Sequence, residues 1–161
     1  MIDEALHRDA LSRFVSGVTV ITTARKGGGI AGLTASAFTS LSLHPPLILV
    51  CVGGQSSSRE AVNASQSFAV HILAEEQQSL AMAFAKSSEN KADGILWTLS
   101  KWGTPILDDY LVAIECRQTK EFFGGDHAII IGEIIDIKID GSGREPMTYY
   151  RGQLNTLMLK K

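Results

Sequence analysis

Short apolar runs rich in β-branched residues dominate the hydrophobic pattern of this chain, and they are typical of β-strands. Residues 18–23 are β-branched throughout, and a glycine-rich turn at 26–29 separates them from residues 30–36, which predicts a hairpin. Two longer runs, 111–122 and 128–139, flank a second glycine-rich turn and predict another hairpin. Further strands are predicted at residues 41–43, 47–52 and 68–73.

The run at residues 47–52 is apolar at every position, which predicts a strand buried on both faces. Helices are predicted at residues 3–16, 56–64 and 75–86, and one helical turn at 92–96 within the polar, irregular segment 87–104. Strands that follow one another as hairpins close into a barrel, which removes their exposed edges. We therefore expect a mainly β fold, an antiparallel barrel with peripheral helices, built by a single domain over residues 1–161.

Composition and charge exclude several classes of protein. Hydrophobic residues at 45% and charged residues at 20% are typical of a folded globular protein. A formal net charge of −2 and scattered basic residues give no reason to expect nucleic acid, and no apolar run approaches the roughly 18 residues of a membrane span. The N-terminus carries early acids and lacks the apolar region of a signal peptide, so we expect a cytoplasmic protein. Cys51 and Cys116 lie in apolar runs as small hydrophobes, and we expect no metal site.

Small and hydroxyl side chains crowd the segment that leads into the strand at 47–52. A wall of small residues lets a flat ring lie against the backbone, whose N–H groups and neighbouring hydroxyls bind polar ring edges. This pattern favours a planar ligand with polar edges, such as a flavin. The alternative is an exposed strand in which the hydroxyls are solvated and the alanines only pack. The candidate ring-binding residues are Thr34, Ala35, Ser36, Ala37 and Ser40.

A predicted helix opens directly after the buried strand and two glycines, at Ser56, Ser57, Ser58 and Arg59. Free N–H groups at a helix start, serine hydroxyls and one guanidinium group together suit a phosphate. The same segment also fits a capping box, in which Ser57 and Glu60 satisfy those N–H groups without a ligand. The two interpretations are compatible. A ring-binding wall and a phosphate cradle that lie one strand apart match the two ends of flavin mononucleotide.

Residues 27–32, GGGIAG, formally match the G-x-G-x-x-G fingerprint of dinucleotide-binding proteins. That fingerprint opens a helix and is followed about twenty residues later by an acid that holds a ribose. Here residues with a β-like bias follow, and the window at 47–55 contains no acid. These glycines therefore predict a hairpin turn and not a Rossmann site.

His127 is the strongest candidate for chemistry among the four histidines, since His7, His44 and His71 fit solvated or structural positions. It follows Gly-Gly-Asp in a predicted tight turn, so its side chain projects from the barrel rim, where the carboxylate of Asp126 can fix its tautomer. The alternative is a turn in which that carboxylate bonds its own backbone. Near the C-terminus, Tyr149, Tyr150 and Gly152 are candidates for an aromatic surface at the site, and the alternative is that these tyrosines belong to the core or an interface.

Four segments together resemble the flavin reductase family: GVTVIT at 17–22, GLTASAFTSLSLHPPL at 32–47, FAVHIL at 68–73 and GGDHAIIIGEI at 124–134. This family comprises small NAD(P)H:flavin oxidoreductases that serve two-component aromatic monooxygenases. The resemblance implies a homodimeric FMN-binding split β-barrel, with FMN or FAD as the flavin and NADH or NADPH as the reductant. It also implies a separate monooxygenase partner that receives the reduced flavin.

The resemblance further assigns roles to the candidate residues. Residues 34–37 would contact the isoalloxazine ring, Val52, Gly53 and Gly54 the ribityl chain, residues 56–59 the phosphate, and His127 would lie by the nicotinamide. The implied activity is hydride transfer to flavin N5. Two alternatives stay open: a split-barrel protein that keeps FMN bound as an electron carrier or sensor, and a structural or interaction domain. The choices between FMN and FAD, and between NADH and NADPH, also stay open.

Overall fold

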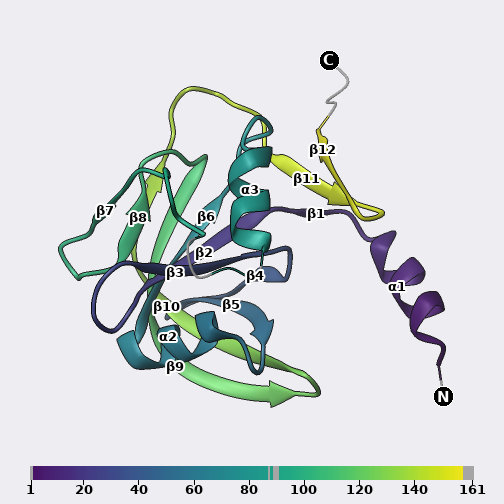
Figure 1. The fold of residues 1–161 in the computed structure, drawn as a ribbon, viewed down its shortest axis with the longest axis horizontal. Helices are drawn as coiled ribbons and strands as arrows, with labels where there is room; N and C mark the ends of the chain where they lie inside the picture. Colours follow the sequence, from purple (N-terminus) through teal and green to yellow (C-terminus); the bar gives the residue numbers. More distant parts are fainter. Residues whose placement is uncertain (1, 87, 89–90, 158–161) are drawn as a thin grey trace.

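A curled antiparallel sheet forms the body of the protein in the computed structural model, which describes residues 2–86, 88 and 91–157 (Figure 1). Its strands are β2 (Thr19–Ala24), β3 (Ile30–Ala35), β4 (Phe38–Leu43), β5 (Pro46–Gly53), β6 (Ser67–Ile72), β9 (Val112–Gly124) and β10 (His127–Ile139). They pair in the order β3-β2-β6-β9-β10-β5-β4. The two outermost strands, β3 and β4, follow one another in the chain through Ser36 and Ala37, so the sheet curls into a barrel.

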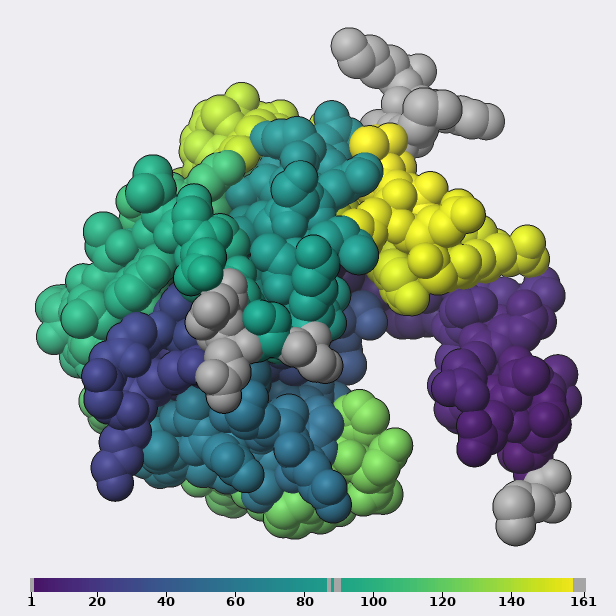
Figure 2. Space-filling view, viewed as in Figure 1, coloured from purple at the N-terminus to yellow at the C-terminus, as the bar shows by residue number. Residues whose placement is uncertain are grey.

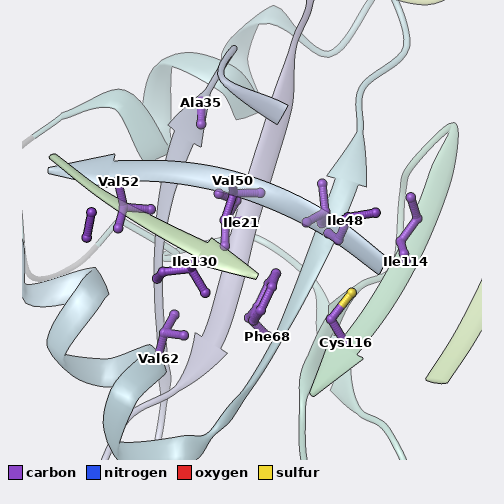
Figure 3. Close-up of a cluster of buried hydrophobic side chains, with 12 residues drawn as sticks. Ile21, Ala35, Ile48, Val50, Val52, Val62, Phe68, Ile114, Cys116 and Ile130 are labelled. Atoms are coloured by element: carbon purple, nitrogen blue, oxygen red, sulfur yellow. The ribbon is translucent and has the colours of Figure 1, made fainter. Parts of the chain in front are cut away.

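Buried side chains from nearly every strand meet inside this barrel (Figure 3). Phe68 of β6 lies at the centre, among Ile21 of β2, Val50 of β5 and Ile130 of β10. Val62 reaches the same cluster from the helix α2 (Ser57–Ser65), which therefore covers one end of the barrel. Burying these side chains removes their apolar surface from water, which is the main favourable contribution to the fold. The predicted mainly β barrel with peripheral helices is confirmed.

A second buried cluster fixes helix α3 (Gln78–Ala85) against the outside of the barrel. Phe84 and Ala81 of α3 pack there with Val18 and Val20, so β2 is buried on both of its faces. Two small sheets flank this layer. They are β1-β11-β12, from β1 (Ser16–Gly17), β11 (Met147–Tyr150) and β12 (Gln153–Thr156), and the pair β7 (Trp97–Leu99) with β8 (Pro105–Leu107).

Helix α1 (Glu4–Ser12) stands apart from the barrel, as Figures 1 and 2 show. Its N-cap is Asp3, whose carboxylate accepts the N–H of Leu6 at 2.9 Å. The described part of α1 buries none of its residues. One backbone bond, from the N–H of Arg151 to the carbonyl of Ser12 at 2.9 Å, links the end of the helix to the β11–β12 hairpin.

Four sequence expectations require correction. Strand β5 is not buried on both faces, because residues 48, 50 and 52 point into the barrel while 47, 49, 51 and 53 stay half-exposed. Residues 92–96 form a hydrogen-bonded turn without a helix, and the segment predicted as irregular contains β7. The first helix ends at Ser12, four residues before the predicted limit. The glycines at 27–29 form the predicted hairpin turn, each with positive φ, and strand β3 follows them. No helix within the described ranges is long and apolar enough to cross a membrane.

Candidate active site

An open groove of about 800 Å³ separates α1 from the barrel, and Figure 2 shows this hollow beside the N-terminal helix. One wall is the link between β3 and β4, where Ser36 and Ala37 are both exposed. The opposite corner is the β11–β12 hairpin, with Tyr149 and Gly152. The structure thus brings four of the predicted site residues together, as two pairs that lie more than 110 positions apart in sequence.

The backbone pins the wall of small residues in place. The N–H of Cys51 in β5 donates to the carbonyl of Ala37 at 3.0 Å, and the N–H of Phe38 donates to the carbonyl of Ser36 at 3.0 Å. Because neither Ser36 nor Ala37 carries a bulky side chain, a flat ring has access to the main chain there. Ser40 lies further along β4, beside a β-bulge, and it does not line this groove.

A second compartment of about 380 Å³ continues the groove toward α3. It shares Ser36, Tyr149 and Gly152 with the first and adds Thr34 and Met82. The hydroxyl of Thr34 donates to the carbonyl of Ala81 in α3 at 2.5 Å. Thr34 therefore lies in the predicted site, but its hydroxyl is already engaged by the protein.

Two predicted ligand contacts face the wrong way for a side-chain interaction. Ala35 is only 9% exposed and Val52 only 1%, and both side chains belong to the barrel core (Figure 3). Successive residues of a strand point to opposite faces, so these positions can offer a ligand nothing but their main chain.

The predicted phosphate cradle at the start of α2 is smaller than expected. Ser56, not Ser57, is the N-cap, and its hydroxyl accepts the N–H of Arg59 at 3.2 Å. Ser58 is buried and donates its hydroxyl proton to the carbonyl of Gly32 at 2.9 Å, so it is not available to a ligand. The guanidinium of Arg59 is engaged by Glu121. What stays open to an anion is the exposed Ser57 and the N–H groups of the helix start that precede Arg59.

The turn between β9 and β10 carries the histidine that the sequence singled out. His127 pairs with Gly53 across the sheet, two residues from the Cys51 position that lines the groove. Its Nδ1 lies 2.8 Å from Oδ1 of Asp126, and the His127 side chain is 53% exposed. The His127 imidazole beside it holds the pKa of the Asp126 carboxyl below its usual range. The carboxylate therefore orients the ring as expected.

The same turn is fixed to the two glycines that end β5. The N–H of Gly54 donates to the carbonyl of Asp126 at 2.9 Å, and an added Cβ on this glycine would lie 3.2 Å from that oxygen. A smaller hollow then joins Asp126 to His7 and Arg8 of α1. The His127 turn and the groove therefore lie along one continuous face of the molecule.

Sequence reasoning missed the residues that complete the groove. Two of them, Leu49 and Cys51, are outward-facing residues of β5. The apolar pattern predicted burial of both faces of this strand and so gave no reason to expect these residues in a site. From the N-terminal helix and the residues just after it come further lining residues that only the fold brings near. They are His7, Arg8, Asp9, Leu11, Ser12 and Phe14.

Residues 11–158 match a family model described as a flavin reductase like domain. The chain belongs to this family. A probable flavin reductase of Rhizobium meliloti is 36% identical over 152 residues, which cover 94% of this chain and 48% of that protein. The reductase subunit HsaB of a flavin-dependent monooxygenase from Rhodococcus jostii is 40% identical over 152 residues, with 94% and 77% covered. The chain thus spans about half the length of the first flavin reductase and three quarters of the second.

Solved structures of the family share the fold over almost the whole chain. Component B of a nitrilotriacetate monooxygenase from Mycobacterium thermoresistibile is 35% identical, with a TM-score of 0.92 and 97% of this chain and 87% of that one covered. The NADH:FAD oxidoreductase SgcE6 of Streptomyces globisporus, in complex with NAD and FAD fragments, is 33% identical, with a TM-score of 0.90 and 97% and 93% covered. The predicted flavin reductase family is confirmed, and the names of these relatives favour a flavin reductase over a protein that stores FMN.

Proposed function

We propose that this flavin reductase uses NADH or NADPH to reduce FMN or FAD that enters the groove from solution, and that it supplies the reduced flavin to a separate monooxygenase acting on an aromatic compound. The observation that carries the proposal is the open groove itself, walled by Ser36 and Ala37 and continuous with the turn that carries His127. HsaB, a relative over nearly the whole chain, is by name the reductase subunit of a flavin-dependent monooxygenase.

The residues present suit a flavin and a reduced nicotinamide. The exposed link of Ser36 and Ala37 offers main-chain polar groups and little bulk, which fits a ring lying flat. The main chain of Gly53 and Gly54 borders the ribityl position, and Ser57 with the first N–H groups of α2 offers an anion site for the phosphate end. The flavin supplies the acceptor for a hydride from the nicotinamide. His127 would position the nicotinamide from the rim, because Asp126 holds its ring in one orientation.

The central experiment compares six reactions side by side: oxidation of NADH and of NADPH with added FMN, FAD or riboflavin. A shuttle enzyme shows turnover that depends on the added flavin and is purified with little of it. A protein that keeps FMN would be purified yellow and gain nothing from added flavin. Absence of any thermal shift with FMN or FAD would instead favour an interaction domain. The pattern of rates also decides the flavin and nicotinamide preferences.

We also propose that two copies of the chain associate. Apolar side chains of the N-terminal segment are each more than half exposed, and helix α1 buries none of its residues among the described parts of the chain. Residues on the outer face of β5 and β10 are apolar as well and only half-buried. The N-terminal set is Ile2, Leu6, Leu11, Phe14 and Val15, and the outer-face set is Leu47, Leu49, Cys51, Ile129 and Ile131.

Covering such surfaces with a second copy would remove them from water and would narrow the open groove. Light scattering on the purified protein tests this proposal, and a dimer is expected at micromolar concentration. Leu11→Glu and Phe14→Glu are expected to shift it toward monomer, whereas a monomeric wild type would contradict the proposal. A cytoplasmic location is proposed together with the function, because reduced nicotinamide nucleotides are supplied there and both cysteines are free thiols.

A further inference from the structure

One partly buried ion pair connects three parts of the candidate site. Arg59 in the first turn of α2 makes a bidentate contact with Glu121 of β9: Nε lies 2.6 Å from Oε1 and Nη2 lies 2.9 Å from Oε2. Both side chains are only 17% exposed. Bidentate guanidinium–carboxylate contacts fix direction as well as distance, so this pair sets how α2 lies against β9.

The same guanidinium also holds the turn at the end of β5. Its Nη1 donates to the carbonyl of Gly54 at 3.0 Å, while the N–H of Gly54 donates to the carbonyl of Asp126 at 2.9 Å. The guanidinium carbon lies 4.6 Å from the ring centre of Phe123, which precedes the His127 turn. The peptide groups of Gly54 are thus held on one side by Arg59 and on the other by the β9–β10 turn.

Glu121 is held in place from a second direction. Nδ2 of Asn63, one helical turn after Arg59, lies 3.3 and 3.4 Å from the two carboxylate oxygens. Oδ1 of Asn63 in turn accepts an N–H from Gln118 of β9 at 2.8 Å. The hydrogen bond from Arg59 holds the pKa of the Glu121 carboxyl below its usual range, so the carboxylate is charged.

We infer that Arg59 and Glu121 are a positioning pair, which fixes the Gly54 turn and the His127 turn at the rim of the flavin site without contacting the flavin. Glu121 and the carbonyl of Gly54 engage three of the five N–H donors of Arg59, and the carboxylate balances its charge, so the guanidinium is a weak phosphate ligand as it stands. The pair instead pre-organises the backbone that a flavin meets, which lowers the cost of binding. The inference rests on the proposed flavin site.

Glu121→Gln distinguishes phosphate binding by Arg59 from positioning of the rim, because the two roles predict opposite changes in the Kd for FMN. If Arg59 binds the flavin phosphate, removal of the competing carboxylate frees the guanidinium and FMN binds more tightly. If the pair positions the rim, FMN and riboflavin both bind more weakly, by about tenfold for the loss of one charge-assisted contact. The measurement is the Kd of each flavin from fluorescence quenching. Tighter FMN binding, or unchanged Kd values for both flavins, would overturn the inference.

Arg59→Met tests the other partner with the same two flavins. A positioning role predicts that the Kd values of riboflavin, which has no phosphate, and of FMN rise by the same factor. A loss confined to FMN would show a direct phosphate contact and refute the inference. Arg59→Lys keeps the charge but not the bidentate geometry, so it is expected to restore little of the lost affinity. Should Arg59→Met fail to fold, Arg59→Lys and the isosteric Glu121→Gln still decide between the roles.

Two controls complete the design. Arg144 is also partly buried and bridges Glu76 and Asp140 away from the groove, so Arg144→Met reports the effect of losing an arginine network on stability alone. If Arg59→Met lowers the melting temperature as Arg144→Met does and leaves flavin binding intact, the pair is merely structural and the inference fails. Ser36→Phe fills the groove and tests the site itself. Flavin binding that survives Ser36→Phe refutes the proposed site, whereas its loss beside an unaffected Glu121→Gln refutes only the pair.

Discussion

The backbone N–H of Leu107 in β8 donates to Nε2 of His71 in β6 across 3.1 Å. Nδ1 of the same imidazole lies 3.1 Å from the carbonyl of Val20 in β2, to which it donates. His71 is fully buried, and burial lowers its pKa from 6.5 to about 4. The neutral tautomer with its proton on Nδ1 therefore joins three strands, and a second proton on Nε2 would break the bond from Leu107.

Acid is expected to weaken the fold through His71. Because the pKa is depressed in the folded state, the contribution of the neutral ring is fully present above pH 6.5 and declines as the pH falls from 6.5 toward 4. The decline is at most about 1.4 kcal/mol per pH unit from this group. Urea unfolding at a series of pH values measures it.

His71→Phe removes the titrating group and supplies the comparison. This variant is expected to be less stable than the wild type at pH 8, since the buried N–H of Leu107 loses its bond to the ring and the carbonyl of Val20 loses one of its bonds. The difference in unfolding free energy between the wild type and His71→Phe should shrink as the pH falls from 6.5 toward 4. A difference independent of pH would contradict the assignment, and His7→Gln on exposed α1 should behave as the wild type.

Long strands could be predicted from the sequence because their signal is local. The hairpin formed by β9 and β10 and the glycine turn at 27–29 follow from β-branched runs and turn residues alone. The pair β7–β8 could not be predicted in this way. β8 is three residues long and fully buried, and its neighbours β2 and β6 are more than 30 positions away, so only tertiary packing makes it a strand.

The site was predicted in part for the same reason. Ser36 and Ala37 can be recognised in the sequence as part of a cluster of small residues. Asp126 and His127 can be recognised as polar residues at a turn between two strands. The partner of Arg59 lies 62 positions away, so the sequence suggested a free cation where the fold holds an ion pair. The residues of α1 that line the groove could not be predicted either, because a helical pattern does not indicate which groove the helix borders.

Gly32→Ala is expected to destabilise the protein by about 1–3 kcal/mol, because it overpacks the contact between β3 and α3. An added Cβ would lie 2.5 Å from the carbonyl oxygen of Ile21 and 2.7 Å from the ring of Phe84, and backbone cannot move aside cheaply. Gly141→Ala is the matched control, since nothing lies within 4 Å of its added Cβ. Equal unfolding free energies for the two variants would refute the close packing at β3.

Thr34→Val distinguishes a role of the Thr34 hydroxyl in stability from a role in flavin binding. Its hydroxyl donates to the carbonyl of Ala81, so the variant should lose about 1 kcal/mol of stability while the Kd for FMN changes less than about twofold. Thr34→Ser keeps the hydroxyl and should retain both properties. The measurements are urea unfolding and flavin fluorescence. Unchanged stability together with a large loss of FMN affinity would instead assign the hydroxyl to the flavin.

His127→Ala should slow hydride transfer far more than it weakens flavin binding. The ring lies at the rim, 53% exposed and oriented by Asp126, where it can align the nicotinamide but reaches the flavin less directly. Loss of alignment is expected to lower the rate of flavin reduction about tenfold to a hundredfold at saturating NADH. Asp126→Asn keeps the imidazole and weakens only its orientation, so a smaller loss is expected. Stopped-flow reduction measures the rate and fluorescence the flavin Kd; wild-type rates in His127→Ala would remove this histidine from the mechanism.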